Sequence, residues 1–147
     1  MSPIVSTIEI DRPPVEVFAY ATDPTRFAEW QHDVVRAQLV GGGPAAVGSR
    51  FTTTRRLGGA ERTMTQEITQ LDHPMSWAAR GVDGPFRAAA TVTVEPLSSG
   101  ARSRVTFALD FHGRGLGDLL TPVIRRMAAR QAPQSYQHLK ERLEKDG

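Results

Sequence analysis

The sequence predicts an α+β fold in which two short helices precede a run of antiparallel strands and one long helix closes the chain. Three observations support this prediction. Apolar and polar residues alternate over residues 3–10, β-rich runs separated by turn residues fill 34–111, and apolar residues recur at helical spacing over 116–143. No repeat, linker or composition shift divides the sequence, so residues 1–147 are expected to form one domain.

The two short helices lie within residues 4–30, IVSTIEIDRPPVEVFAYATDPTRFAEW. A Pro-Pro pair suits the opening of the first helix because proline needs no backbone donor there, and Asp11 is expected to cap it. Asp23 and the proline after it repeat this signal for a second helix that ends at Trp30. Helices this short cannot bury a core between themselves, so we expect them to rest on a larger curved surface.

The middle of the sequence reads as strands joined by short turns. Gly58-Gly59 is expected to form a hairpin turn, and Asp83-Gly84-Pro85 another turn. Connections this short favour an antiparallel meander over alternating β and α units. The expected strands after the first one are 34–40, 50–57, 61–71, 76–82, 86–94 and 102–111.

The final helix is predicted from apolar residues spaced three and four apart, with a second group further along. The first group is Leu116, Leu119, Leu120, Val123, Ile124 and Met127, and the second is Tyr136, Leu139 and Leu143. Pro133 falls inside this helix, where proline removes a backbone hydrogen bond. We therefore expect a kink or break near residues 130–132.

Composition excludes several classes of function. The chain has no cysteine, so disulfides, thiolate catalysis and cysteine-based metal sites are ruled out. Neither a signal peptide nor a membrane-spanning apolar run is visible, and we expect a cytoplasmic protein that does not insert into a membrane. The net charge is only +2 and the arginine pairs are dispersed, which disfavours a nucleic-acid partner.

The order of these elements resembles the START-like (SRPBCC) superfamily, and specifically its polyketide cyclase/dehydrase-like branch. The segments that carry the likeness are IEIDRPPVEVFAYATDPTRFAEW, GGGPAAVGSRF, LDHPMSWAARG and RSRVTFALDFHGRGLGDLLTPVIRRMAARQ. The resemblance implies a helix-grip (Bet v 1-like, START-like) fold, a bent antiparallel sheet wrapped around the long C-terminal helix. It also implies that the short helices plug one end and that an apolar pocket lies between sheet and helix.

The alternation of side chains along strands predicts which residues face inward. Val35, Ala37 and Leu39 share one face, and Trp77 is preferred over Arg80 as an inward residue. Arg55, Gln66 and, if it faces inward, Arg80 are candidates to orient a ligand carbonyl or carboxylate. The alternative is that the whole set simply packs against the helix. The expected ligand-binding residues are Phe51, Thr53, Arg55, Met64, Gln66, Ile68, Trp77, Phe86, Ala88, Phe107, Leu109, Phe111, Leu120, Val123, Ile124 and Met127.

No catalytic constellation is visible in the sequence. The glycines of GRGLGD lack the spacing of a dinucleotide-binding loop, and the histidines are too dispersed for a metal site, so neither a cofactor nor a metal is expected. His112 is the histidine nearest the expected pocket mouth. Glu67 and Asp110 alternate with apolar residues and are expected on the solvated outer face.

Three functions follow from this reading. The first is binding of a small hydrophobic or aromatic, lipid- or polyketide-like molecule in the internal pocket. The second is an enzyme of cyclase/dehydratase type acting in the same pocket, and the third is a module that binds a partner protein through an exposed apolar groove. A kink at Pro133 would open the pocket mouth or expose a surface for a homodimer.

Overall fold

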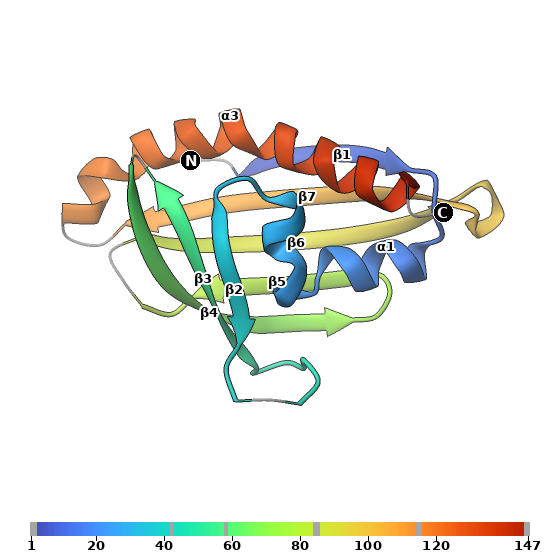
Figure 1. The fold of residues 1–147 in the computed structure, drawn as a ribbon, viewed down its shortest axis with the longest axis horizontal. Coiled ribbons are helices and arrows are strands. Elements are labelled where there is room, and N and C mark those ends of the chain that lie inside the picture. The colour runs from blue at the N-terminus through green and yellow to red at the C-terminus, as the bar shows by residue number, and fades with distance from the viewer. Residues whose placement is uncertain (1–2, 42, 58, 84–85, 114–115, 146–147) are drawn as a thin grey trace.

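The computed structural model describes residues 3–41, 43–57, 59–83, 86–113 and 116–145, without the side chains of residues 57, 86 and 112–120. In these residues seven strands form one antiparallel sheet in the order β1-β7-β6-β5-β4-β3-β2. Figure 1 shows the sheet curling strongly, so that β2–β4 cross β5–β7 in this view, while α3 runs along β7 and β1. The expected meander is confirmed, because every strand from β2 to β7 pairs with the next one along the chain.

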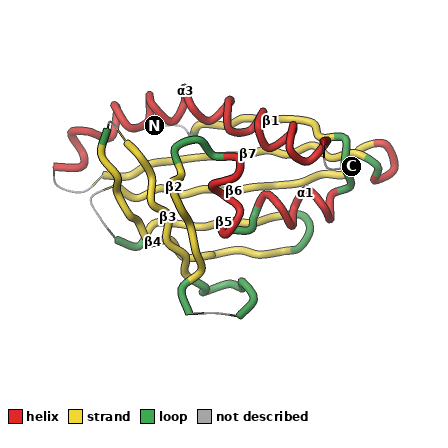
Figure 2. Tube along the Cα trace, viewed as in Figure 1, coloured by secondary structure: helices red, strands yellow, loops and turns green. Residues whose placement is uncertain are grey.

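The elements follow the predicted order, and Figure 2 shows α3 above the strands and α1 below it. The strands are β1 Ile4–Ile10, β2 Val34–Leu39, β3 Arg50–Leu57, β4 Ala60–Asp72, β5 Ser76–Gly81, β6 Phe86–Leu97 and β7 Arg102–Gly113. The helices are α1 Pro14–Ala21, α2 Phe27–Trp30 and α3 Leu116–Lys145, with 3₁₀ turns at Pro24–Arg26 and Ser98–Gly100.

The two short helices begin differently. Asp23 accepts hydrogen bonds from the backbone N–H and the hydroxyl of Thr25, as the sequence predicts. The prediction that Asp11 caps α1 is wrong, since Pro13 occupies the cap position without a side-chain hydrogen bond. The backbone N–H of Asp11 instead donates to Glu144 Oε2 at 2.9 Å, which ties the start of α1 to the end of α3.

β2 departs from simple alternation at its start. The register against β3 shifts between Val34 and Arg36, which marks a β-bulge. Because a bulge adds one residue to one strand, it reverses the face on which the preceding side chains lie. Val34 is therefore buried and Val35 is 39% exposed, so the prediction that Val35 faces inward is wrong, whereas Ala37 and Leu39 pack against the core as expected.

α3 is continuous through Pro133, so of the predicted kink or break near residues 130–132 the break is wrong. The proline denies a hydrogen bond to the carbonyl of Ala129, and both residues are exposed, which leaves that carbonyl open to water. On the opposite side of the helix Ala132, Tyr136 and Leu139 are buried in the core. Packing on the buried side thus holds the helix together while the cost of the proline falls on the solvent side.

Candidate functional site: a cavity between the sheet and the long helix

A cavity of about 160 Å³ lies between α2, the inner face of the sheet and α3. Its wall combines residues from opposite ends of the sequence, because the curled sheet brings β3 and β4 over the side of α3. The lining residues are Ala21, Phe27, Trp30, Gln31 and Asp33 from the N-terminal segment, Phe51, Arg55, Met64, Gln66, Trp77 and Ala79 from β3–β5, Ala88, Ala90, Thr91, Val92, Phe107, Leu109 and Phe111 from β6–β7, and Ile124, Met127, Ala128, Gln131, Ala132, Ser135 and Tyr136 from α3.

Aromatic rings dominate this wall. Among the described side chains, seven of the chain's ten aromatic residues line the cavity, including both tryptophans. Phe27 of α2 contacts Phe51 and Trp77 edge to face, with centroids 5.8 and 6.3 Å apart. On the other side Phe107 and Tyr136 stack with centroids 3.9 Å apart and planes 8° from parallel. These contacts connect α2, the sheet and α3 through rings with well-defined orientations.

One ion pair belongs to the wall. Arg55 Nη1 donates to Asp33 Oδ2 at 3.0 Å, and the two side chains are 23% and 16% exposed. Asp33 lies between α2 and β2, so the pair joins that link to β3. Gln66 is engaged as well, because its Nε2 donates to the buried Thr53 hydroxyl at 3.1 Å. The charges of Arg55 and Asp33 offset each other, which leaves the described part of the wall without net charge.

Two hydroxyl groups on α3 remain available to an occupant. Ser135 and Tyr136 are each 5% exposed and line the cavity, and neither hydroxyl has a hydrogen-bond partner among the described residues. Neither oxygen is completely closed off, and both side chains belong to the cavity wall. Burial raises the pKa of Tyr136 well above its ordinary value, although the positive charge of Arg55 acts in the opposite direction. Tyr136 is therefore a neutral hydroxyl at physiological pH.

The two indole N–H groups behave differently. Trp30 Nε1 and Trp77 Nε1 are inaccessible and have no hydrogen-bond partner within the described part of the chain. Each indole is instead surrounded by rings, with Trp30 next to Phe107 and Tyr136, and Trp77 next to Phe27. Because these N–H groups do not face open space, they present no donor to an occupant of the cavity.

The structure brings most of the predicted ligand-binding residues to the cavity and leaves some outside it. Thr53 and Ile68 are fully buried and do not line it, and Val123 is 49% exposed on the outer side of α3. The side chains of Phe86 and Leu120 lie outside the described residues. The predicted residues in the lining are Phe51, Arg55, Met64, Gln66, Trp77, Ala88, Phe107, Leu109, Phe111, Ile124 and Met127.

Sequence reasoning missed the lining residues supplied by the N-terminal segment and by the second half of α3. Trp30 ends a short helix with an apolar face, and this pattern could have predicted that it lies in the wall of the cavity. Tyr136 continues the helical apolar spacing, so it was assigned to packing alone. Gln31 and Asp33 lie in a link without periodicity, and no local pattern marks them.

The remaining candidates for chemistry lie outside the cavity. Arg80 is exposed and pairs with Glu67, so the suggestion that Arg80 orients a ligand is wrong, and Glu67 lies on the outer face as expected. Asp110 is not simply solvated, because it is half-buried and forms an ion pair of 2.7 Å with Arg125 of α3. The side chain of His112 is outside the described residues. Among the described residues no three metal-binding side chains cluster.

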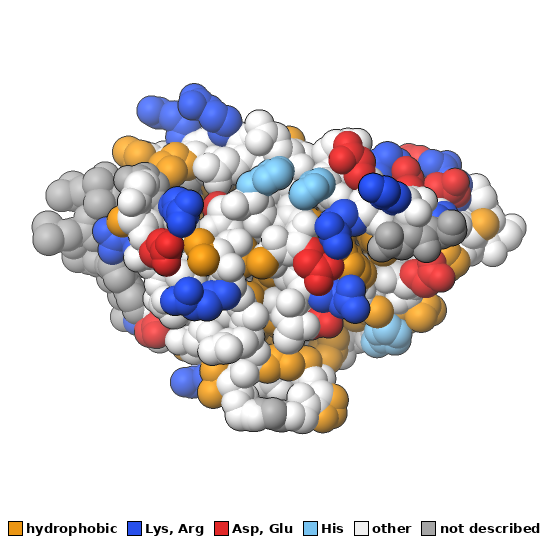
Figure 3. Space-filling model, in the orientation of Figure 1, with side chains coloured by type: hydrophobic (Ala, Val, Ile, Leu, Met, Phe, Trp, Pro, Cys, Tyr) orange, Lys and Arg blue, Asp and Glu red, His pale blue; other side chains and the backbone are white. Residues whose placement is uncertain are grey.

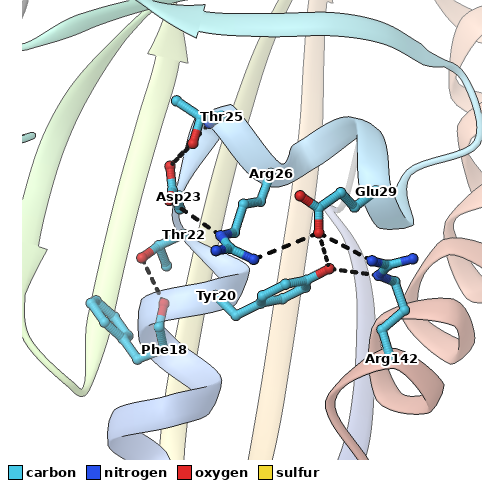
Figure 4. Close-up of polar contacts among 8 residues, drawn as sticks. All are labelled: Phe18, Tyr20, Thr22, Asp23, Thr25, Arg26, Glu29 and Arg142. Carbon is cyan, nitrogen blue, oxygen red and sulfur yellow. Dashed lines mark hydrogen bonds and ion pairs between the residues drawn. The ribbon is translucent and has the colours of Figure 1, made fainter. Parts of the chain in front are cut away.

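A polar network holds the N-terminal helices against α3, as Figure 4 shows. The Tyr20 hydroxyl donates to Glu29 Oε1 at 2.8 Å and accepts from Arg142 Nε at 2.8 Å. Arg142 also pairs with Glu29, and Arg26 lies over the Tyr20 ring at 5.4 Å from its centroid. The network thereby connects α1 and α2 to the last turns of α3, and it keeps Phe27 and Trp30 in place at the end of the cavity.

On the outer surface of the described residues, charged and apolar side chains are both spread over several elements. In Figure 3 acidic and basic side chains are interspersed over most of the visible face, and basic side chains stand together at the edge above α3. Large exposed apolar side chains occur in several separate elements of the described chain. They are Val5, Val15, Val35, Val40, Val47, Met75 and Val123. Within the described residues, this distribution gives no support to the exposed apolar groove expected of a partner-binding module.

The cavity is small for the pockets of known ligand-binding proteins. Such pockets typically measure about 300–1,000 Å³. The volume of about 160 Å³ found here is close to the roughly 150 Å³ of an engineered apolar cavity that binds benzene. The described cavity therefore has room for one aromatic ring with a small substituent, and not for a long extended chain.

The curled sheet gripping a long C-terminal helix, with a cavity between them, is the helix-grip arrangement of START-like and Bet v 1-like proteins. Solved structures agree with this class. A START superfamily protein from Mycobacterium smegmatis superposes with a TM-score of 0.81 and 11% identity over 100% of both chains. The Zhui aromatase/cyclase from Streptomyces sp. R1128 gives a TM-score of 0.80 and 14% identity over 97% of this chain and 93% of that one. The protein TTHA0849 from Thermus thermophilus gives 0.78 and 18% identity over 96% of each chain.

The sequence itself places the chain in a family. Residues 1–144 match the model of the family described as polyketide cyclase / dehydrase and lipid transport, and the chain belongs to this family. The predicted resemblance to the START-like superfamily and its cyclase/dehydrase branch is thus confirmed. A comparison with curated proteins gives no match. Within the described residues no helix has the length and apolar character needed to cross a bilayer.

Proposed function

We propose that this protein binds a small hydrophobic or aromatic molecule in the cavity between the sheet and α3. The observation that carries the proposal is the wall itself, in which seven aromatic side chains surround open space inside the fold. A cavity lined mainly by apolar side chains with a few polar groups is the usual form of a small-molecule site. The family description, which includes lipid transport, supports a binding role.

A titration with aromatic probes and a variant that fills the cavity test this proposal. Ala90 lines the cavity, and its neighbour Ala89 on the same strand does not. Ala90→Leu is expected to weaken binding of a single-ring aromatic by at least about tenfold, while Ala89→Leu leaves it unchanged. Since both tryptophans border the cavity, their indole signals in a ¹⁵N-correlated spectrum report its occupancy. If no apolar or aromatic probe moves either indole signal, the proposed function is wrong.

A second candidate is an enzyme of the cyclase/dehydratase type, which one specific observation favours. Arg55, Asp33 and Tyr136 all lie on the wall, and the charge of Arg55 influences the Tyr136 hydroxyl. In such a reaction an enolised carbon attacks a carbonyl carbon of the same chain, and water then leaves. Asp33 would take a proton from the attacking carbon, Arg55 would stabilise the negative charge that develops on the attacked oxygen, and the Tyr136 hydroxyl would donate a proton to that oxygen. When water leaves, the Tyr136 phenolate would take the second proton from the same carbon and the protonated Asp33 would supply the second proton of the water, which restores both groups.

The enzymatic candidate requires a rate measurement. A synthetic poly-β-keto thioester would be incubated with the protein, and loss of water would be followed by mass spectrometry. Catalysis predicts acceleration over buffer that Arg55→Met abolishes, whereas Arg56→Met, which changes an exposed arginine on the same strand, retains it. Equal rates in the presence and absence of protein exclude this candidate for that substrate class and leave the binding proposal unaffected.

A further inference from the structure

We infer that the ligand of this cavity is a compact, uncharged aromatic molecule with an oxygen acceptor, such as an aromatic ketone, and that the Tyr136 hydroxyl receives its oxygen. This inference rests on the proposed function, because it specifies which molecules occupy the same cavity. Three observations carry it. They are an available hydroxyl, a wall without net charge, and a small volume.

Tyr136 supplies the polar contact. Its side chain is 5% exposed and lines the cavity, and its hydroxyl has no hydrogen-bond partner among the described residues and is not completely closed off. A buried hydroxyl without a partner costs free energy, and an occupant with an acceptor would remove that cost. The stack of the Tyr136 ring on Phe107 limits where the hydroxyl points, so the acceptor must lie at one end of the ligand. The adjacent Ser135 hydroxyl offers a second donor of the same kind.

The electrostatics of the wall favour an uncharged molecule. Arg55 would attract a carboxylate if it stood alone, but it donates to Asp33 at 3.0 Å. A carboxylate ligand would lose its hydration on entering the cavity and would face Asp33 as well as Arg55. The Tyr136 hydroxyl remains protonated because burial raises its pKa, so it donates to a neutral acceptor without adding charge.

The dimensions of the cavity limit the rest of the ligand. A volume of about 160 Å³ admits one ring with a short substituent. Phe27 meets the rings of Phe51 and Trp77 edge to face, and the planes of those two rings are 36° apart, which favours a flat aromatic body over a flexible alkyl chain. A long acyl chain would need a much larger opening between sheet and helix.

The test compares four probes of matched design on the full-length protein. Acetophenone carries the carbonyl, α-methylstyrene replaces its C=O by C=CH₂ at nearly the same shape, benzoate adds a negative charge, and decanoate is a long acyl chain. Dissociation constants come from ¹⁵N chemical-shift titrations that include the two indole signals. We expect acetophenone to bind about tenfold more tightly than α-methylstyrene and more tightly than benzoate or decanoate.

Tyr136→Phe is the decisive variant, because it removes the hydroxyl and keeps the ring on Phe107. It is expected to bring acetophenone and α-methylstyrene within about twofold of each other. Gln137→Ala is the control, since Gln137 is exposed on the same helix and lies outside the cavity lining, and it should preserve the tenfold preference. The folding of each variant is checked by its thermal unfolding.

The outcomes separate the two proposals. Equal binding of acetophenone and α-methylstyrene by the wild type, or an unchanged preference in Tyr136→Phe, overturns the inference and leaves the proposed function standing. Tighter binding of benzoate overturns the argument for an uncharged ligand, and tighter binding of decanoate overturns the argument from size. Absence of binding by all four probes overturns both proposals.

Discussion

The ring of Tyr136 on α3 lies flat against the ring of Phe107 on β7, with centroids 3.9 Å apart and planes 8° from parallel. This contact joins the long helix to the sheet beside the cavity. Because the stack sits in the interior, the Tyr136 hydroxyl is largely removed from water, and its ionised form is disfavoured. The relationship between these two residues therefore leads directly to a prediction about pH.

The alkaline behaviour of the protein is expected to depend on Tyr136. Its pKa is raised in the folded state, so the unfolded chain loses this proton first, near the ordinary value of about 10. The contribution of the protonated Tyr136 to the free energy of unfolding is fully present below that pH. It is lost as the pH rises towards the pKa of Tyr136 in the folded state. Urea unfolding above pH of about 10 should therefore show the wild type losing stability faster than Tyr136→Phe.

The absorbance of phenolate gives an independent check. The chain has two tyrosines, and burial raises the pKa of Tyr20 as well, with a further contribution from its hydrogen bond to Glu29. In Tyr136→Phe the remaining signal belongs to Tyr20 alone. A phenolate step in the wild type at the ordinary pKa, absent from Tyr136→Phe, would contradict the buried position of the Tyr136 hydroxyl.

Asp33 is expected to balance the charge of Arg55. Asp33→Asn leaves the partly buried guanidinium without its counter-charge, and we expect a loss of about 1–2 kcal/mol in the free energy of unfolding. The exposed pair Arg56–Glu61 provides the control, because Glu61→Gln should change stability by less than about 0.5 kcal/mol. Both values are measured by urea denaturation.

The same substitution should alter which probes bind. With Asp33→Asn the described wall carries a net positive charge, so the affinity for benzoate should rise relative to acetophenone. The ratio of the two dissociation constants is the quantity to compare with the wild type. An unchanged ratio would show that Asp33 does not control charge selectivity in the cavity.

The Tyr20–Glu29–Arg142 network should couple the N-terminal helices to α3. A double-mutant cycle with Tyr20→Phe and Arg142→Met is expected to give a coupling energy of about 0.5–1.5 kcal/mol in urea denaturation. The effects of contacts that Arg142 makes with other residues cancel in the coupling energy. A parallel cycle of Tyr20→Phe with Lys140→Met should give no coupling, because Lys140 pairs with Glu144 instead. Equal coupling in the two cycles would argue against the network.

Replacement of Pro133 should stabilise the protein. Since α3 is continuous and Pro133 lies on its exposed side, Pro133→Ala restores a backbone donor to the carbonyl of Ala129. The free energy of unfolding is expected to increase by about 1–2 kcal/mol, and the melting temperature should rise. The increase is smaller than the full cost of a proline in a helix because alanine also raises the entropy of the unfolded chain. Pro14→Ala at the first position of α1 offers no such gain. A lower melting temperature for Pro133→Ala would refute this interpretation.

The departures from the sequence-based predictions have identifiable physical causes. Val35 was placed inward by alternation, and a bulge that depends on how β2 pairs with β3 put Val34 there instead. Asp11 looked like a helix cap, but its backbone is bound by Glu144 from the other end of the chain. Pro133 was expected to break α3, and tertiary packing of its neighbours preserved the helix. In each case a long-range contact outweighed a local preference.

Local patterns in the sequence predict the order and type of the elements, because hydrophobic periodicity and turn residues act over a few neighbouring positions. They also identify inward residues such as Phe51, Trp77 and Phe107, since alternation along a strand is a local property. The charge balance between Asp33 and Arg55 and the place of Tyr136 in the cavity wall could not be predicted from such local patterns. Those relationships, and the volume of the cavity, depend on how far the sheet curls towards α3, which no single segment encodes.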